Sequence, residues 1–203
     1  MKLGIVNYGM GNMHSIKSAF KHLNCNDIIE VTTIEQLKLC DKVVLPGVGS
    51  YGLATKKLNE LDLRNAIIDY AEDLKRPILG ICLGMQLMGA SSTEEGKNLG
   101  LGLIGGEVTK FIPGAQKIPH VGFNEVLYEE GSVLFSKFED KKLDFYFTHS
   151  YCMKSSFNTL NSICTYGEKF IAAYEKENIF GTQFHPELSQ SNGLKLLQNF
   201  LDF

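Results

Sequence analysis

The chain is 203 residues long, 44% of them hydrophobic, and carries a formal net charge of −3 at pH 7. We expect one domain over 1–203, because this length suffices for a sizeable core and the composition is globular. The nearly neutral charge, without a basic stripe, argues against a nucleic-acid binder. No apolar run approaches bilayer-spanning length, so no membrane partner is expected.

The five cysteines are an odd number and show no close pair spacing. This pattern favours a reducing compartment over a disulfide framework or a metal site. The first residues, MKLGIV, lack the pattern of a secretory signal and indicate a buried strand instead. We therefore expect a cytoplasmic protein without a bound metal.

The first half of the chain alternates apolar runs with helical patterns. Short runs that are wholly or mostly apolar predict strands over 3–6, 28–31, 43–45 and 78–79. Apolar residues with helical spacing predict helices over 16–23 and 67–74, and 33–37 is compatible with a short helix. This alternation predicts an α/β fold whose central sheet is mostly parallel and is flanked by helices on both faces.

After Ala90 the pattern changes. The glycine-rich stretch 89–106 indicates a surface excursion, not a domain boundary. Additional antiparallel strands are expected in the C-terminal half, over 107–111, 123–127 and 144–147. A hairpin around Glu177-Asn178 is expected from the runs 171–174 and 179–184, and a final helix carries Leu194, Leu197 and Leu201.

The segment 77–88 predicts a strand, a tight turn and a helix around one cysteine. Apolar residues precede the pentapeptide GICLG (80–84), and the helix-prone MQLM follows it. Glycines on both sides of Cys82 permit a sharp turn, which is the setting of a nucleophile elbow. The alternative is a buried core cysteine beside a glycine turn.

The C-terminal part of the chain supplies a base for this thiol. The expected strand over 179–184 is followed directly by His185-Pro186-Glu187. His185 can act as the general base, and Glu187 can orient its ring and stabilise its charged form. A lone His-Pro-Glu would be weak evidence. A cysteine elbow and a His-x-Glu pair, each at a strand end, together predict a Cys–His–Glu triad.

With these motifs the chain resembles the class I, triad-type glutamine amidotransferases. The motifs NYGMGN (7–12), LPGVGS (45–50) and PHVGFN (119–124) narrow the resemblance to the glutaminase subunits of imidazole glycerol phosphate synthase. It covers essentially the whole chain, and it implies that glutamine is hydrolysed to glutamate and ammonia through a cysteine thioester.

The resemblance also implies the roles of individual residues. Cys82, His185 and Glu187 would form the triad, and the backbone N–H groups of Leu83 and Val48 would form the oxyanion hole. The residues implied in binding L-glutamine are Gly49, Gln86, Ser150 and Tyr151. No cofactor is implied, and the GMGN turn lacks the spacing of a phosphate loop.

The implied partner is a (β/α)₈-barrel cyclase, bound as a heterodimer, that receives the ammonia and makes imidazole glycerol phosphate in histidine biosynthesis. The residues that match partner-facing positions are Asn12, Phe123, Asn124 and Leu188. The family usually has Trp in place of Phe123 and Lys in place of Leu188, so the identity of the partner stays open at this point.

Three alternatives compete with this interpretation. The first is a paralogous glutaminase subunit that supplies ammonia for amidation of a surface sugar. The second is a cysteine hydrolase of the same superfamily, which the QFHPE strand end disfavours. The third is a non-enzymatic partner-binding subunit, against which the intact Cys82, His185 and Glu187 argue.

Overall fold

The computed structural model describes residues 1–112, 114 and 116–203. Parallel strands form the centre of the molecule: β1 (Leu3–Val6), β2 (Ile28–Val31), β3 (Lys42–Leu45), β4 (Ile78–Ile81) and β13 (Ile179–Thr182). Their order in the sheet is β2-β1-β3-β4-β13. The predicted parallel half of an α/β fold is therefore confirmed.

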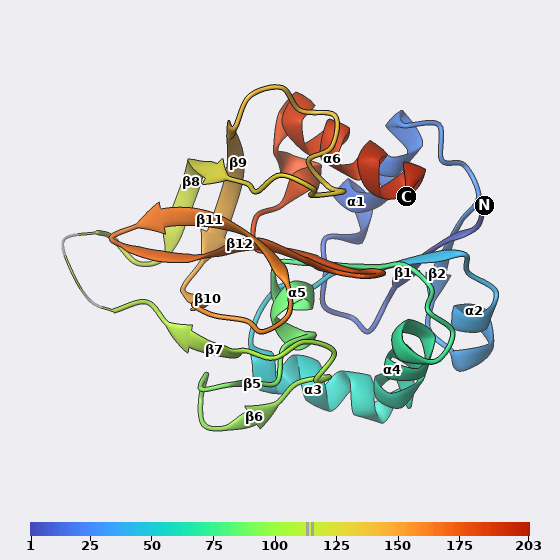
Figure 1. The fold of residues 1–203 in the computed structure, drawn as a ribbon. Helices are drawn as coiled ribbons and strands as arrows, with labels where there is room; N and C mark the ends of the chain where they lie inside the picture. Colours follow the sequence, from blue (N-terminus) through green and yellow to red (C-terminus); the bar gives the residue numbers. More distant parts are fainter. Residues whose placement is uncertain (113, 115) are drawn as a thin grey trace.

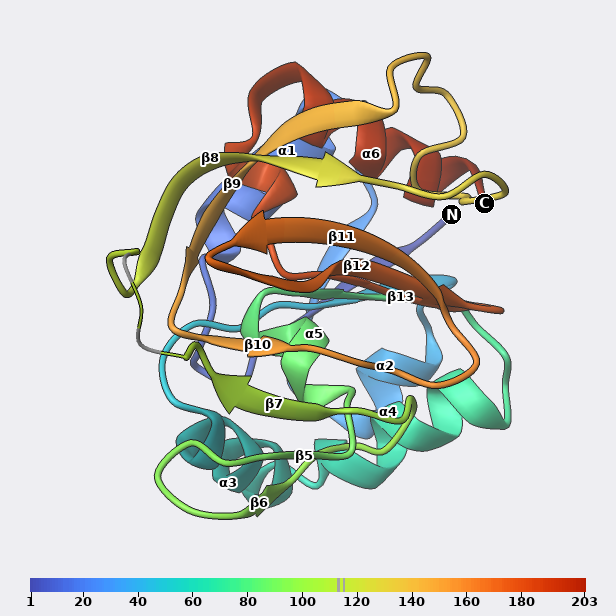
Figure 2. The ribbon, with the colours of Figure 1, turned by 60° about the vertical axis from the view of Figure 1, so that its left-hand side comes forward.

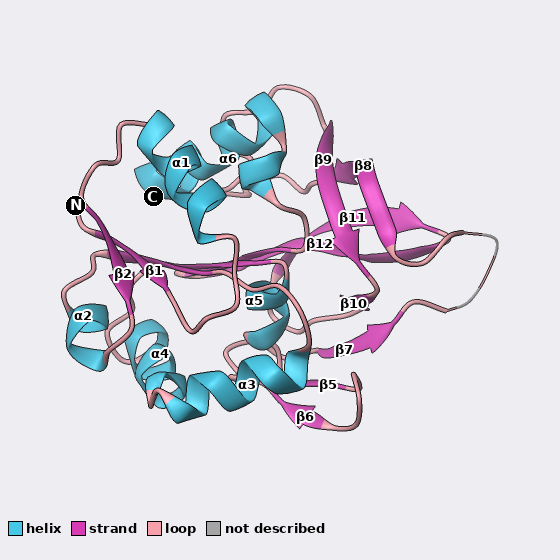
Figure 3. Cartoon of the chain, turned by 180° about the vertical axis from the view of Figure 1, so that it is seen from behind, coloured by secondary structure: helices cyan, strands magenta, loops and turns pink. Residues whose placement is uncertain are grey.

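Helices cover both faces of this sheet (Figures 1 and 3). The helices α1 (Met13–His22) and α6 (Gln190–Asp202) lie on one face. On the other face lie α2 (Ile34–Lys38), α3 (Tyr51–Glu60), α4 (Leu63–Glu72) and α5 (Leu83–Leu87). Alternate residues of β3 serve the two layers: Val43 and Leu45 pack with α2–α5, whereas Val44 packs with α1 and α6.

Antiparallel strands extend the same sheet beyond β13, as predicted for the C-terminal half. They are β12 (Glu168–Lys176), β11 (Leu160–Tyr166), β8 (His120–Leu127) and β9 (Lys142–His149), and neighbours in this order are hydrogen-bonded to each other. Strands β12 and β13 pair around Glu177-Asn178, which confirms the expected hairpin. Figure 2 shows how β8 and β9 curve at this end of the sheet.

A second sheet has the order β10-β7-β5-β6 and lies on the α3 side of the molecule (Figure 2). Its strands are β10 (Tyr151–Met153), β7 (Glu107–Lys110), β5 (Ser91–Ser92) and β6 (Asn98–Leu99). The expectation that 89–106 is only a surface excursion is wrong, because it supplies two of these strands. Its residues Leu103 and Ile104 are also buried in the core.

Two helices differ from what the sequence predicts. Helix α3 was not predicted, because its sequence YGLATKKLNE is largely polar; its apolar contacts come from Tyr51, Ala54 and Leu58. The helix expected over 67–74 ends at Glu72, and Leu74 is exposed. None of the helices in the described ranges has the length and apolar character that a bilayer crossing requires.

Candidate active site

Cys82 occupies a strained turn between β4 and α5. Its backbone has φ 53° and ψ −110°, a region that side chains other than glycine rarely adopt. The surroundings impose this conformation: the Cys82 N–H donates to the carbonyl of Thr182 (2.7 Å), and the Cys82 carbonyl accepts from Gln86 N–H (3.1 Å). A Cβ on Gly80 would lie 2.7 Å from the nitrogen of Met85, so only glycine fits beneath α5.

The parallel pairing of β13 with β4 brings His185 to the same edge of the sheet, since Thr182 lies opposite Ile81. The His185 N–H donates to the carbonyl of Tyr146 (2.9 Å), and Ser189 Oγ donates to the His185 carbonyl (2.6 Å). The strand expected to reach residue 184 ends at Thr182, which frees the backbone for these contacts.

Glu187 orients the imidazole of His185. It lies in the short 3₁₀ helix η1 (Pro186–Leu188), and its Oε1 is 2.8 Å from His185 Nδ1. The carboxylate can only accept, so Nδ1 carries the hydrogen. The Glu187 side chain is 1% exposed, which keeps this pair out of bulk water.

The electrostatics of His185 reflect its two neighbours. Burial lowers the pKa of His185, but the charges of Cys82 and Glu187 act in the opposite direction and outweigh burial, so the pKa is raised above its ordinary value. His185 Nε2 is buried and makes no hydrogen bond to any described residue. The structure thus favours the charged form of His185, between the Glu187 carboxylate and the Cys82 sulfur.

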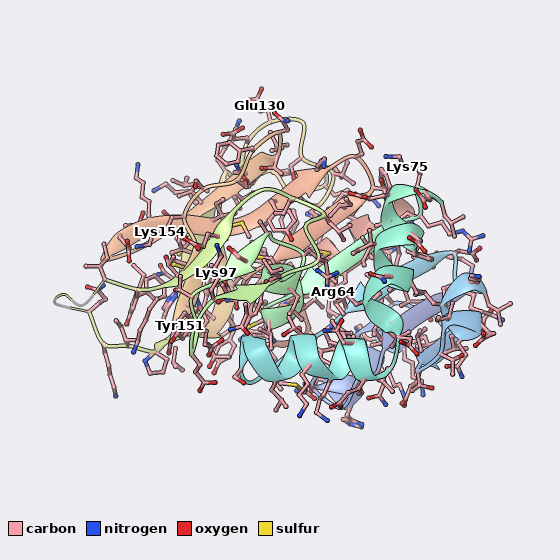
Figure 4. All side chains as sticks on the ribbon, turned by 90° about the horizontal axis from the view of Figure 1, so that it is seen from below. Arg64, Lys75, Lys97, Glu130, Tyr151 and Lys154 are labelled. Carbon is pink, nitrogen blue, oxygen red and sulfur yellow. The ribbon has the colours of Figure 1, made fainter. Side chains whose placement is uncertain are left out.

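Cys82 and His185 both open onto a pocket of about 480 Å³. The described residues that line it are Val48, Gly49, Cys82, Leu83, Gln86, Glu94, Pro119, Thr148, His149, Ser150, Tyr151 and His185. The residues that sequence analysis assigned to the oxyanion hole and to substrate binding all lie in this set. Tyr151, labelled in Figure 4, is the first residue of β10 in the second sheet.

The loop after β3 is pressed against the start of α5. Tyr8 Oη donates to the carbonyl of Pro46 (2.8 Å), and a Cβ on Gly47 would lie 2.8 Å from Leu83 Cβ. Gly49 has φ +97°, a conformation that favours glycine. The N–H groups at the start of α5 precede its first intrahelical bond and have no partner within the helix. Val48, the residue after Gly47, and Leu83 both line the pocket wall.

Two buried amides connect this wall to the sulfur. Gln86 Nε2 donates to the carbonyl of Tyr151 (2.9 Å) and to Gln183 Oε1 (2.8 Å). Gln183 Nε2 in turn donates to Cys82 Sγ (3.7 Å). Both donor hydrogens of Gln86 are used within the protein, so its side-chain oxygen is the atom left for a ligand.

Sequence analysis missed Glu94 as a pocket residue. One carboxylate oxygen of Glu94 accepts from the N–H of Tyr51 (2.9 Å), at the start of α3. Glu94 is the acidic side chain among the described residues that line the pocket. It stands in the glycine-rich stretch beside Glu95, where no spacing or periodicity distinguishes one glutamate from the next.

The residues matched to partner-facing positions differ in their exposure to solvent. Asn12, Phe123 and Leu188 are exposed, and the Asn12 side chain also accepts from Ser15 N–H to cap α1. Asn124 is turned inward, because its Nδ2 contacts His120 Nε2 (3.3 Å) and the carbonyl of Thr165 (3.3 Å). On strand β8, Phe123 and Asn124 point to opposite faces.

Comparisons with known proteins agree with this geometry. Residues 4–202 match the family model described as glutamine amidotransferase class-I. The chain belongs to the class I glutamine amidotransferase family.

Among the more similar relatives is imidazole glycerol phosphate synthase subunit HisH of Leptospira interrogans, 42% identical over 203 residues and covering 98% of each chain. Subunit HisH 1 of the same enzyme from Campylobacter jejuni strain RM1221 is 42% identical over 200 residues, again covering 98% of each chain. A solved structure described as a glutamine amidotransferase shares the fold, with a TM-score of 0.79 and 17% identity over 100% of this chain and 98% of that one. The resemblance stated from the motifs is confirmed.

Proposed function

We propose that this chain is the glutaminase subunit of an imidazole glycerol phosphate synthase and acts in histidine biosynthesis. The main support for this proposal is the 42% identity, over 98% of each chain, to proteins that bear this name. The site geometry is compatible with the chemistry. Residues 1–203 would act as one catalytic domain that hydrolyses glutamine to glutamate and ammonia.

Cys82, His185 and Glu187 are the proposed catalytic triad. The sulfur of Cys82 attacks the side-chain carboxamide carbon of glutamine, and a C–S bond forms. The C–N bond then breaks, and His185 gives its Nε2 proton to the departing ammonia. His185 next takes a proton from a water whose oxygen attacks the thioester carbon. The C–S bond then breaks, glutamate leaves, and the free sulfur beside the protonated His185 is restored. Glu187 holds the imidazole in the required tautomer throughout.

The tetrahedral intermediates place a negative charge on the former carbonyl oxygen. The proposed donors to it are the backbone N–H groups of Leu83 and Val48. Two observations support these donors. Both residues line the pocket beside Cys82, and Leu83 begins a helix whose first N–H groups have no partner within the helix. Each such donor contributes about 3 kcal/mol of transition-state stabilisation.

The same pocket offers groups for the two ends of glutamine. The Glu94 carboxylate suits the α-ammonium group, and the free side-chain oxygen of Gln86 suits an N–H donor of the substrate. Gly49, Ser150 and Tyr151 complete the proposed binding set, with backbone and hydroxyl groups for the α-carboxylate. We assign these groups to the ends of glutamine by their charge, because an ammonium group that leaves water needs a carboxylate or carbonyl partner.

Ammonia released into water would be protonated and lost, so the proposal includes a cyclase subunit as partner. We propose a (β/α)₈ barrel in a cytoplasmic heterodimer, contacting the side that carries Asn12, Phe123 and Leu188. Leu188 is the last residue of η1, which begins directly after His185, and Phe123 shares a surface pocket with Ser189, the residue after η1. Partner contact at η1 therefore lies next to the triad.

The experiment is to measure glutamate release by this chain with and without a purified cyclase subunit. We expect slow hydrolysis by the chain alone, a rise with the partner and its ligand, and complete loss in Cys82→Ala. The matched control, Cys25→Ala, removes a thiol far from the pocket. The Cys82→Ala complex should still synthesise from added ammonium; loss of both activities in a folded complex would contradict the proposal.

Complementation of a histidine auxotroph separates the proposed pathway from the surface-sugar alternative. We expect growth when the gene is supplied with its cyclase partner. Glutaminase activity without complementation would instead support the surface-sugar alternative, in which Leu188 and Phe123 contact a different partner.

A further inference from the structure

Gln183 lies directly behind the reactive sulfur and has no role in the reaction as described above. Its side chain is fully buried and is not among the described residues that line the pocket. Gln183 and His185 lie two residues apart, just beyond the end of β13 at Thr182. Cys82 shares the pocket with His185, and the amide of Gln183 contacts its sulfur from outside the pocket lining.

The orientation of this amide is determined by its neighbours. The carbonyl of Tyr151 can only accept, so the Nε2 group of Gln86 must face it. The second hydrogen of that group then faces Gln183, whose Oε1 must be the acceptor. As a result the Nε2 of Gln183, and not its oxygen, points at Cys82 Sγ at 3.7 Å.

A longer chain of hydrogen bonds anchors this arrangement to the sheet. His149 Nδ1 donates to the same Tyr151 carbonyl (2.8 Å), which makes His149 Nε2 an acceptor. His120 Nδ1 therefore donates to it (3.1 Å), and Asn124 Nδ2 contacts His120 Nε2 (3.3 Å). The Tyr151 carbonyl that accepts from Gln86 is thus itself held by His149 on β9, and His149 in turn by His120 on β8.

We infer that Gln183 is a positioning residue for Cys82: its side-chain N–H fixes the position of the sulfur and stabilises the thiolate over the thiol. This inference rests on the proposed function and adds a residue to that site. An N–H donor favours the charged form of its acceptor, whereas a group that only filled space would not. The effect acts on the sulfur before any substrate binds.

The test is the rate of Cys82 alkylation by iodoacetamide as a function of pH. Gln183→Met keeps the side-chain length and removes the donor. We expect alkylation at pH 7 to slow about tenfold or more, as for loss of a hydrogen bond to a charged group, and the rate profile to move to higher pH. Gln198→Met, on α6 far from the site, is the control, and Cys82→Ser corrects for the other cysteines.

A second variant guards against a folding defect. Gln183→Glu keeps an oxygen that accepts from Gln86 but puts a second oxygen in place of the N–H group that faces the sulfur. We expect the alkylation rate to fall by the same factor or more. An alkylation profile equal to that of the unmodified protein in a folded Gln183→Met or Gln183→Glu variant would overturn the inference. Absence of glutamine hydrolysis by the unmodified chain with its partner would instead overturn the proposed function, so the two failures are distinguishable.

Discussion

A Cβ atom on Gly84 would lie 1.8 Å from the carbonyl oxygen of Leu45. Helix α5 therefore rests directly on the end of β3, and no side chain fits between them. This contact fixes the elbow against the loop 46–49, and residues of both line the pocket.

Gly84→Ala should consequently push α5 away from β3 and disturb the elbow. We expect a loss of about 1–3 kcal/mol or more in the free energy of unfolding, as for other overpacked sites, together with loss of glutaminase activity. Thermal and urea unfolding measure the first effect and glutamate release the second. Gly52→Ala is the matched control, because its Cβ would meet only the Asn98 side chain, at 3.2 Å. Equal stability of the two variants would contradict the proposed contact.

Glu187→Gln should reduce glutamine hydrolysis at least ~100-fold, because the amide neither stabilises the imidazolium nor guarantees the tautomer. The 2.8 Å contact to His185 Nδ1 retains an acceptor, so the fold should be unaffected. Steady-state glutamate release with the partner present is the measurement, with the exposed Glu129→Gln as control. Activity within a few-fold of the unmodified protein would exclude Glu187 from the triad.

The buried histidine pair should make the protein sensitive to acid. Burial lowers the pKa of His120 to about 4; for His149, burial outweighs the hydrogen bond to Tyr151 and lowers the pKa to about 3. Between these values and the ordinary pKa near 6.5, the unfolded chain binds more protons than the native one. Stability is therefore lost as the pH falls from about 6.5 to 4, by up to about 3 kcal/mol for each group.

His120→Phe tests this dependence. The new ring can keep the stacking on Tyr166 and Phe147, whose centroids lie 3.9 and 4.7 Å from that of His120. We expect lower stability at pH 7, by about 1–2 kcal/mol for the unpaired His149, but a shallower decline toward pH 4. Urea unfolding across this range is the measurement, and the exposed His22→Gln is the control. An unchanged slope would show that His120 does not titrate in this way.

Phe123→Ala should weaken binding of the cyclase partner about tenfold or more, as expected for an aromatic anchor at an interface. Phe123 is 49% exposed and stacks edge-on against Tyr146, so the stability of the isolated chain should change little. Calorimetric titration with the purified partner measures the affinity. Phe157→Ala, at a side chain that is 71% exposed near Gly105, is the control. Equal affinities for both variants would place the interface elsewhere.

Local patterns were sufficient to predict the elbow and the parallel half of the sheet. Apolar runs and helical spacing act over a few residues. Gly80 is required by a contact with Met85 within the same strand–turn–helix unit, whereas Gly84 is required by its contact with Leu45 on β3. The polar α3 and the two-residue strands β5 and β6 were missed because their stability comes from packing and distant pairing. Arg64 illustrates this, since it reaches from α4 to the carbonyl of Gly100 (Figure 4).

The sequence by itself therefore determined the family, the fold class and the motifs that carry Cys82 and His185. The tertiary structure alone decided which groups surround the sulfur. Gln86 meets Tyr151 and Gln183 across 65 and 97 positions of the chain, and Glu94 enters the pocket from the second sheet. Such contacts leave no periodic trace in the sequence, because they depend on how sheets and helices pack and not on the spacing of neighbouring residues.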